Sequence, residues 1–555
     1  MSRIEPIRNE GFLKKIFEFC DKLSFKSSIA RTMYGSATIF LVAIILIPPT
    51  VGVTLKWDLL DETLRNPTLV SRAQSAILSS FAIAFIVAFL DLLAGLPTAW
   101  LIVRKKSKWI NLVDTLIDIP FIIPTVALGF STLTFWSLPE GISSLFKVES
   151  LVSPGARLII LLHFAFSYPI IVRVLVGELQ GYDQTHEIVA RTLGASTFTS
   201  VRTVTLPILK PALISAYLLA FCRSLSETGA TVIVAGVFEN GPVFIQNARV
   251  ANQEGPMVLV SLVLIASACA IFAIISFLGP KLKFPIKKVW PRFEKSLSSS
   301  RPVRIRNILS LIFFGFFVAV PSLFIALPAI LAFFDGTIID AIRGIGVWSD
   351  FWMSLVMSYA IGLAATLMNI IIGFPMAIVI ARRKLGHRIT AILDALINIP
   401  IIIPSIALGV SLNVFWTSFG SVPEILVLIL VHTTITYPYF TRVIAASIES
   451  IPEELEDVAR TLGASPFEVF RKIIFPLTKY SFLSGAIMVL TRSVDETGAT
   501  LAVVKQITTV PVLLVNWITN PQKYSSSTVG LGIFFLVLTA FVSLISFRIV
   551  FRRRE

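Results

Sequence analysis

Long apolar stretches alternate with short polar segments along nearly the whole chain. Most of these stretches approach the length of about 20 residues with which an α-helix crosses the hydrocarbon core of a bilayer. The pattern predicts twelve membrane-spanning helices, near residues 37–56, 76–103, 113–136, 157–177, 209–236, 257–280, 307–334, 354–381, 392–417, 425–447, 481–504 and 527–549. The sequence therefore predicts an all-α polytopic membrane protein.

Composition agrees with this prediction and narrows it. The 555 residues are 55% hydrophobic and 15% charged, with a mean hydropathy of +0.83, which excludes a water-soluble globule. A net charge of +15 could suggest nucleic acid, but the Lys and Arg residues gather in short segments between apolar runs, as they do beside a membrane. Nucleic acid is therefore excluded as a partner, and membrane lipid is expected.

Basic segments predict both the domain organisation and the orientation. The Pro- and Ser-containing linker 281–306 separates a first half, 37–280, from a second half, 307–550, and the tails are 1–36 and 551–555. The tails, the linker and the segments between spans two and three of each half carry the excess of Lys and Arg. The positive-inside rule places them, and both termini, in the cytoplasm. Residues 12–23 have one apolar face, which suits either a helix on the membrane surface or a solvated tail.

The two halves repeat each other. The phrase "ARTLGAS" occurs at 190–196 and again at 459–465, "SETGAT" at 226–231 corresponds to "DETGAT" at 495–500, and "DIPFIIPTVALG" corresponds to "NIPIIIPSIALG". Each half has six predicted spans and thus the same orientation. The pattern predicts a parallel duplication about an axis along the membrane normal, with the pathway between the halves.

The repeated phrase lies in loops 178–207 and 449–476, between the fourth and fifth spans of each half. Start signals for helices and a Gly that ends a helix predict a helix-turn-helix elbow in each loop. The signals in the second loop are Ser450 with Pro452 and Glu453, then Gly463, then Ser465 with Pro466 and Glu468; those in the first are Asp183, Gly194 and Ser196.

Both elbows resemble the coupling loop of the membrane subunits of type I ATP-binding-cassette importers, whose pattern is Glu-Ala-Ala, three residues and Gly. The resemblance covers nearly the whole chain, and fused permeases of ferric iron and thiamine importers are similar. It implies a multi-pass protein of a prokaryotic cell membrane that docks two cytoplasmic ATP-binding subunits and receives substrate from an extracytoplasmic binding protein. The implied coupling residues are Glu187, Ala190, Gly194, Ala195, Glu456, Asp457, Ala459, Gly463 and Ala464.

The elbows depart from the family pattern in one respect. The family's Glu stands six residues before the Gly, where this chain has Ile188 and Asp457, and Glu187 and Glu456 come one residue earlier. Asp457 can fill the family role, whereas the first elbow must use Glu187 or do without. The two contacts with the ATPase subunits are therefore expected to differ in strength.

Ionisable residues inside predicted spans mark candidate pathway residues, because a charge in the membrane is costly. Arg223 and Glu227 are four residues apart on the fifth span, and Arg492 and Glu496 repeat this spacing on the eleventh, so each pair can meet on one helix face. Two hypotheses fit: a structural ion pair, or a pathway in which the Glu side chains face a wet cavity. The "ETGAT" stretches resemble the Glu-Phe-Gly-Ala stretch of molybdate and sulfate permeases. Further candidates are Gly229, Gly498 and Asp495, whose counterpart is Ser226.

Other residues inside the spans predict local structure. His163 and His432 are equivalent, and either interhelical hydrogen bonds or ligand binding fits them. The Pro residues predict kinks or broken turns near the pathway: Pro120, Pro124, Pro169, Pro400, Pro404 and Pro438.

No catalytic set is present in the sequence. There is no G-x-x-x-x-G-K-[ST] phosphate-binding loop, so the chain is not expected to be an enzyme, and ATP and Mg²⁺ belong to the partner subunits. No cofactor or metal site is predicted in the chain. The alternative function is an ion-gradient-driven transporter, which would also carry basic residues between spans two and three. The expected substrate is an inorganic ion, ferric iron or an oxyanion, with thiamine or another small organic solute as the alternative.

Overall fold

The computed structural model describes residues 18, 19, 21–278, 281 and 290–552. Within these residues every regular element is a helix. Nine helices are long and apolar enough to cross a membrane, and three bent helix pairs bring the described residues to as many as twelve spans. The predicted all-α fold with two sets of six spans is confirmed. Of the expected surface helix at 12–23, residues 12–17 and 20 lie outside the described residues.

The first half begins with a long, irregular span over Arg31–Leu64. Its helices in chain order are α2 (Ser27–Phe40), α3 (Ile47–Val51), α4 (Trp57–Leu64), α5 (Pro67–Arg104), α6 (Lys108–Leu116), α7 (Ile119–Ile122), α8 (Thr125–Ser137), α9 (Ala156–Gly181), α10 (Thr185–Thr192), α11 (Thr197–Ser200), α12 (Leu206–Ile208), α13 (Lys210–Ser226), α14 (Gly229–Val234), α15 (Gly241–Val250) and α16 (Glu254–Leu278).

The second half repeats this order after a short linker helix. The linker helix is α17 (Pro291–Leu297). The helices that follow are α18 (Ser300–Phe314), α19 (Val320–Leu323), α20 (Ala326–Phe334), α21 (Thr337–Arg343), α22 (Val347–Ala381), α23 (His387–Leu396), α24 (Ile399–Ile402), α25 (Ser405–Thr417), α26 (Glu424–Glu449), α27 (Glu453–Thr461), α28 (Pro466–Val469), α29 (Phe475–Val494), α30 (Gly498–Val503), α31 (Val510–Thr519) and α32 (Ser526–Arg552).

The third span of each half is sharply bent. The axis turns by 108° between α7 and α8 and by 105° between α24 and α25. In each case an Ile in extended conformation, Ile123 or Ile403, precedes a Pro. Pro disfavours the helical conformation of the residue before it and has no N–H to continue the ladder. The predicted breaks thus occur at Pro124 and Pro404. At "SYP" and "TYP" the helices α9 and α26 run through their Pro residues without a break, and a kink there stays a prediction.

The first span of each half packs against the other half. The hydroxyl of Ser411 in α25 donates to the Pro48 carbonyl at 2.9 Å and accepts from the Val53 N–H at 3.1 Å. In the reciprocal contact, the span formed by α18 and α19 lies against α5 and α8. The hydropathy pattern gives no sign of this exchange, which ties the halves together at both edges.

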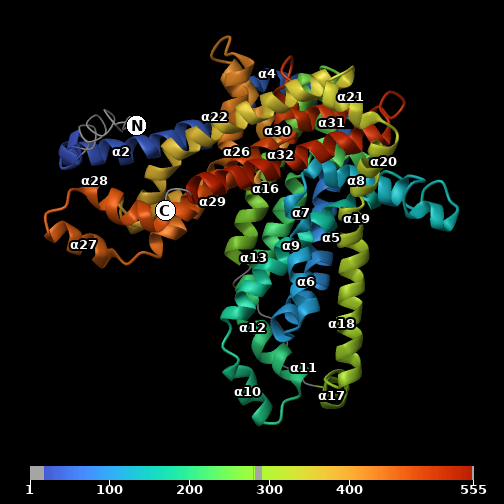
Figure 1. The fold of residues 1–555 in the computed structure, drawn as a ribbon, viewed down its shortest axis with the longest axis horizontal. Helices are drawn as coiled ribbons and strands as arrows, with labels where there is room; N and C mark the ends of the chain where they lie inside the picture. The colour runs from blue at the N-terminus through green and yellow to red at the C-terminus, as the bar shows by residue number, and fades with distance from the viewer. Residues whose placement is uncertain (1–17, 20, 279–280, 282–289, 553–555) are drawn as a thin grey trace, which may run out of the picture.

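Two limbs diverge from a shared centre (Figure 1). One limb ends in α27 and α28, with α2 beside it, and the other ends in α10 and α11, with α17 beside it. The elbows predicted from the repeated phrase therefore lie at the far ends of the two limbs, and the centre holds the candidate pathway.

Candidate transport pathway and elbow surfaces

The "ETGAT" stretches break the fifth and eleventh spans at the centre of the molecule. α13 ends at Ser226 and α14 starts at Gly229, and α29 and α30 are interrupted in the same way. A Cβ atom on Gly229 would lie 2.5 Å from the Thr497 Cβ, and one on Gly498 would lie 2.7 Å from the Thr228 Cβ. The two breaks therefore touch across the interface between the halves, and Gly is required there for close approach.

The structure brings both intramembrane ion pairs together. Arg223 Nη1 lies 2.9 Å from Glu227 Oε2, and Arg492 Nη2 lies 2.6 Å from Glu496 Oε2. The other oxygen of each carboxylate accepts a backbone N–H at the start of the next helix, from Ala230 at 3.2 Å and from Ala499 at 3.0 Å. The Glu side chains are 5% and 2% exposed. Each Glu is therefore turned onto the backbone that follows it, as the hypothesis of a structural ion pair implies, and a part for either Glu in the pathway stays a prediction.

The arginines, not the glutamates, face a cavity between the halves. The guanidinium-bearing side chains are 26% and 24% exposed although they lie at the centre. They border a cavity of about 230 Å³ whose lining contains no carboxylate: Ile170, Leu219, Cys222, Arg223, Ser226, Pro400, Ile401, Ile403, Ser405, Ile435, Tyr439 and Arg492. The sequence pattern did not predict Ser405 or Tyr439 as neighbours of these arginines, because both come from other spans, α25 and α26 of the second half.

Asp495 makes the centre asymmetric, as expected from its counterpart Ser226. Its Oδ1 atom accepts the Thr125 N–H at 2.9 Å, at the start of α8 in the other half. On the opposite side, the Ser405 hydroxyl donates to the Ser226 carbonyl at 3.2 Å. Asp495 therefore braces the two halves against each other and does not line the cavity.

The two equivalent His residues bridge the helix breaks. The His163 ring nitrogens lie 2.8 Å from the hydroxyls of Ser224 and Thr231, on either side of the first break. His432 lies 2.7 Å from the Ser493 hydroxyl and 3.0 Å from that of Thr500. Both ring nitrogens of each His are thus engaged in interhelical hydrogen bonds. Among the described residues, no group of three or more His, Cys, Asp or Glu side chains is placed to hold a metal ion.

One buried acid was missed by sequence reasoning. Asp91 is fully buried in α5 and accepts the hydroxyl of Ser167. Asn369 occupies the similar place in α22, where its amide nitrogen donates to the Thr436 hydroxyl at 2.9 Å. A polar residue within an apolar run, acidic in the first half and an amide in the second, was the available signal, and it marks an interhelical contact in each half.

Both elbows have the predicted helix-turn-helix form. Gly194 and Gly463 lie after α10 and α27 with φ of +94° and +91°, the region that favours Gly. The hydroxyl of Ser196 accepts the Thr199 N–H at 3.2 Å, and that of Ser465 accepts the Glu468 N–H at 2.9 Å.

The expected capping box at Ser450 is wrong. Ser450 ends α26, its hydroxyl donates to the Ser447 carbonyl, and α27 starts after Pro452 without a side-chain cap. Asp183 caps the first elbow locally, because its carboxylate accepts the Thr185 N–H at 2.9 Å.

Glu187 and Glu456 face inward and offer no surface to a partner. Glu187 pairs with Arg104 at the end of α5 at 2.7 Å, and Glu456 pairs with Arg382, next to the end of α22, at 2.8 Å. Both Glu residues fasten an elbow to the second span of their own half, and of the two alternatives for the first elbow this favours the one that does without an acid at its surface. Asp457, one residue on, is exposed.

Each elbow presents apolar side chains outward. Leu193 and Leu462, just before the turn glycines, are 83% and 81% exposed. The Ala residues of the motif are half-buried behind them, at positions 190, 195, 459 and 464. The exposed members are Ile188, Val189 and Leu193 on the first elbow and Leu455, Val458 and Leu462 on the second. Only the second elbow adds exposed acids within its helix, Glu453, Glu454 and Asp457.

A segment preceding the first span of each half clamps the elbow of the other half. In the linker strap (residues 290–299), Glu294 is buried and pairs with Arg202 at 2.6 Å, and the Ser298 hydroxyl accepts the Phe198 N–H at 2.9 Å. In the N-terminal strap (residues 21–26), Asp21 accepts the Ser465 hydroxyl at 2.6 Å, and Ser24 accepts the Phe467 N–H at 3.3 Å. The two straps are thus crossed and equivalent.

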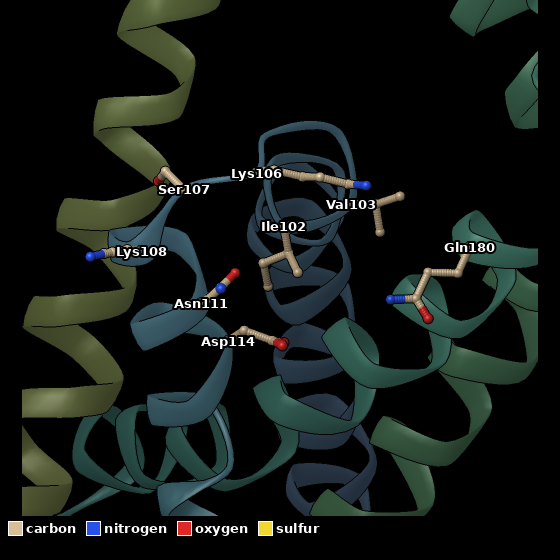
Figure 2. A pocket seen from close by; sticks show the side chains of 8 residues that line it. All are labelled: Ile102, Val103, Lys106, Ser107, Lys108, Asn111, Asp114 and Gln180. Carbon is tan, nitrogen blue, oxygen red and sulfur yellow. The ribbon is translucent and has the colours of Figure 1, made fainter.

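A larger hollow of about 650 Å³ lies away from the interface between the halves, where α5 turns into α6. Lys106 and Lys108 point in opposite directions there, and Asn111, Asp114 and Gln180 are further lining residues (Figure 2). Asp114 is engaged by Arg173 at 2.6 Å. All of its lining residues belong to the first half, so this hollow does not lie between the halves and is not a candidate for the pathway, although it is the larger of the two.

Two six-span units of the same orientation, joined around a central cavity and each ending in an elbow, define a duplicated membrane permease. The chain belongs to the family of binding-protein-dependent transport system inner membrane components, whose model matches residues 91–284 and 370–555. It is the membrane-spanning permease of an ATP-binding-cassette importer, as the elbow motifs predict. The ion-gradient-driven alternative receives no support.

Relatives match the chain over about one half at a time. The sulfate transport system permease protein CysT of Salmonella typhimurium is 30% identical over 207 residues, 36% of this chain and 73% of that protein. The molybdate/tungstate transport system permease protein WtpB of Pyrococcus abyssi is 27% identical over 260 residues, 45% of this chain and 97% of that protein. The second alignment spans nearly a whole relative with less than half of this chain, in agreement with the duplication.

Proposed function

We propose that this permease imports a tetrahedral oxyanion, such as sulfate, molybdate or tungstate, across the cell membrane by alternating access. The observation that carries the proposal is the similarity to permeases named for sulfate and for molybdate and tungstate. The cavity chemistry supports it, since two arginines and no carboxylate line the space between the halves. A ferric cation would be repelled there, which ranks the oxyanion above ferric iron and thiamine.

The exposed elbows are the proposed docking surfaces for two ATP-binding subunits. Large apolar side chains such as Leu193 and Leu462 are rarely left so exposed at a turn without a partner, and each elbow presents three of them in one patch. ATP and Mg²⁺ are bound by those subunits, so the permease itself is not an enzyme. The positive-inside rule places the elbows, the linker and both termini in the cytoplasm, and the binding protein docks on the opposite face.

The ion pairs between elbow and span suggest how movement is transmitted. When the ATP-binding subunits close, they carry the two divergent limbs toward each other (Figure 1). Glu187 with Arg104, and Glu456 with Arg382, fix each elbow to the second span of its own half. The crossed straps fix it to the first span of the other half. A displacement of either elbow is therefore passed to both halves at once.

Reconstitution tests this function. The permease, its ATP-binding subunits and its binding protein are placed in vesicles, and uptake of labelled sulfate, molybdate, ferric iron and thiamine is measured with and without ATP. We expect ATP-dependent uptake of an oxyanion and ATP hydrolysis that rises with the loaded binding protein. Uptake of ferric iron or thiamine in place of either oxyanion would overturn the substrate, and uptake independent of ATP would overturn the mechanism.

A further inference from the structure

We propose that Arg223 and Arg492 form an oxyanion site within the permease itself, at the interface between its halves. This inference rests on the proposed oxyanion function and goes beyond it, because it assigns part of the selectivity to the membrane subunit. The site is the cavity of about 230 Å³, to which the two halves contribute one arginine each.

The geometry of the ion pairs gives the cavity a positive wall. Each Arg forms an ion pair with its Glu, which does not line the cavity. The second oxygen of each Glu carboxylate accepts a backbone N–H, that of Ala230 or Ala499. The ion pairs with Glu227 and Glu496 engage Nη1 of Arg223 and Nη2 of Arg492. A guanidinium has five N–H donors in a planar fork, so donors remain for a second anion. The positive member of each ion pair thus lines the cavity, and the negative member does not.

The carboxyl and imidazole groups near the arginines do not line the cavity. Asp495 is engaged by the Thr125 N–H and is absent from the lining, and His163 and His432 are held by hydroxyls on both ring nitrogens. Arg223 also lies over the Phe166 ring, 4.7 Å from its centroid, which fixes its direction. The other lining side chains are mostly apolar, and an apolar wall strengthens charge-assisted hydrogen bonds.

The size and the neutral polar groups suit a tetrahedral oxyanion. One water occupies about 30 Å³ in the liquid, so the cavity holds the volume of roughly seven waters, enough for the ion and part of its hydration shell. Ser226, Ser405 and Tyr439 add hydroxyls to the lining. Because the two arginines belong to different halves, a movement of the halves relative to each other changes the distance between them, and we expect it to release an anion bound by both.

Charge-neutral variants test the site without leaving a buried charge unpaired. Two double variants remove one whole pair each: Arg223→Gln with Glu227→Gln, and Arg492→Gln with Glu496→Gln. A simple exchange of Arg and Glu is unsuitable, because the guanidinium would then face the backbone N–H group that now donates to the Glu carboxylate. The matched control is Arg442→Gln with Asp394→Asn, an ion pair of 2.7 Å outside the cavity. In the vesicles described above, either cavity variant should lower sulfate and molybdate uptake roughly tenfold or more, as expected for losing a charge-assisted hydrogen bond, and the control should not.

A labelling measurement keeps the proposal testable if those variants fold poorly. Ser226→Cys is made in a chain whose three native Cys residues are replaced by Ser, and its rates of reaction with an anionic sulfonate reagent and a cationic ammonium reagent are compared during ATP turnover. We expect the anionic reagent to react faster and sulfate or molybdate to slow it. Equal rates, no reaction with either reagent, or uptake unchanged in the neutral-pair variants would overturn the site. If the unaltered complex transports neither oxyanion, the proposed function fails instead.

Discussion

Glu294 of the linker strap pairs with Arg202 of the first elbow at 2.6 Å, in a contact where the Glu side chain is 1% exposed. The pair joins the segment before the second half's first span to the coupling elbow of the first half. Burial alone would raise the pKa of the Glu294 carboxyl, but hydrogen bonds from Thr199 and from the Trp290 N–H, with the charge of Arg202, outweigh it and hold the pKa below its ordinary value. The strap is therefore a charged clamp.

Glu294→Ala should loosen the first elbow. The change removes the buried carboxylate that accepts from the Thr199 hydroxyl and pairs with Arg202, which costs roughly 1–3 kcal/mol locally. Amide exchange over 196–206 should become faster by a corresponding factor, while Lys295→Ala, an exposed neighbour on the same helix, should leave it unchanged. Folding lowers the pKa of Glu294, so the ionised carboxylate stabilises the clamp fully at neutral pH. This stabilisation begins to fall when the pH drops below the ordinary pKa of Glu, and it is lost as the pH passes through the lowered pKa of the folded protein. Unchanged exchange in the Ala variant would contradict the clamp.

Glu456→Ala should weaken its elbow more than Glu187→Ala weakens the other. Arg382, the partner of Glu456, is 4% exposed, whereas Arg104, the partner of Glu187, is 21% exposed and can be rehydrated more easily. Breaking a buried pair by removing one partner costs about 3–5 kcal/mol, and the second elbow should approach that value. Limited proteolysis within 449–476 and 178–207 compares the two. Asp457→Ala, an exposed acid on the same helix as Glu456, is the control, and equal protection of both elbows would argue against the difference.

Gly463→Val should uncouple the permease from its ATP-binding subunits without unfolding the membrane helices. Nothing lies within 4 Å of a Cβ at this position, so the penalty is backbone strain at φ +91°, about 1–2 kcal/mol for a non-Gly residue. Gly194→Val should act likewise at φ +94°. The readouts are ATPase co-purification and substrate-stimulated ATP hydrolysis. Gly463→Asn, which tolerates positive φ better, should retain more coupling. Normal coupling in the double Val variant would remove the docking role of the elbows.

Gly229→Ala should disturb the contact between the halves. The added Cβ would meet the Thr497 Cβ at 2.5 Å, and overpacking of this kind costs about 1–3 kcal/mol. Gly498→Ala faces Thr228 and the Ser405 hydroxyl and should behave similarly. Gly177→Ala, where nothing lies within 4 Å, is the matched control within a helix and should not lower the thermal unfolding temperature. A stability equal to that control would mean that the two breaks do not touch.

Cysteine labelling tests the orientation. Lys295→Cys lies in the linker strap, which the excess of basic residues assigns to the cytoplasm. In intact cells a membrane-impermeant thiol reagent should leave it unlabelled, and it should label once the membrane is opened. Labelling in intact cells would reverse the predicted topology.

The sequence by itself determined the number and order of the spans, the duplication, the elbows and the bends at Pro124 and Pro404. These features depend on local properties: apolar length, the missing N–H of Pro and the freedom of Gly194 and Gly463 to adopt positive φ. Spacing of four residues also sufficed to pair Arg223 with Glu227.

Only the tertiary structure decided which way those groups face and what meets across the two halves. The four-residue spacing places Arg and Glu on the same helix face, just before a helix break. It does not show that the Arg lines a cavity while the Glu is turned onto the next helix. Nor could it show that Glu187 and Glu456 are buried, since their partners Arg104 and Arg382 are 83 and 74 residues away in sequence. The exchange of first spans and the crossed straps are likewise contacts between distant segments, and apolar surfaces of either half would satisfy the same hydropathy pattern.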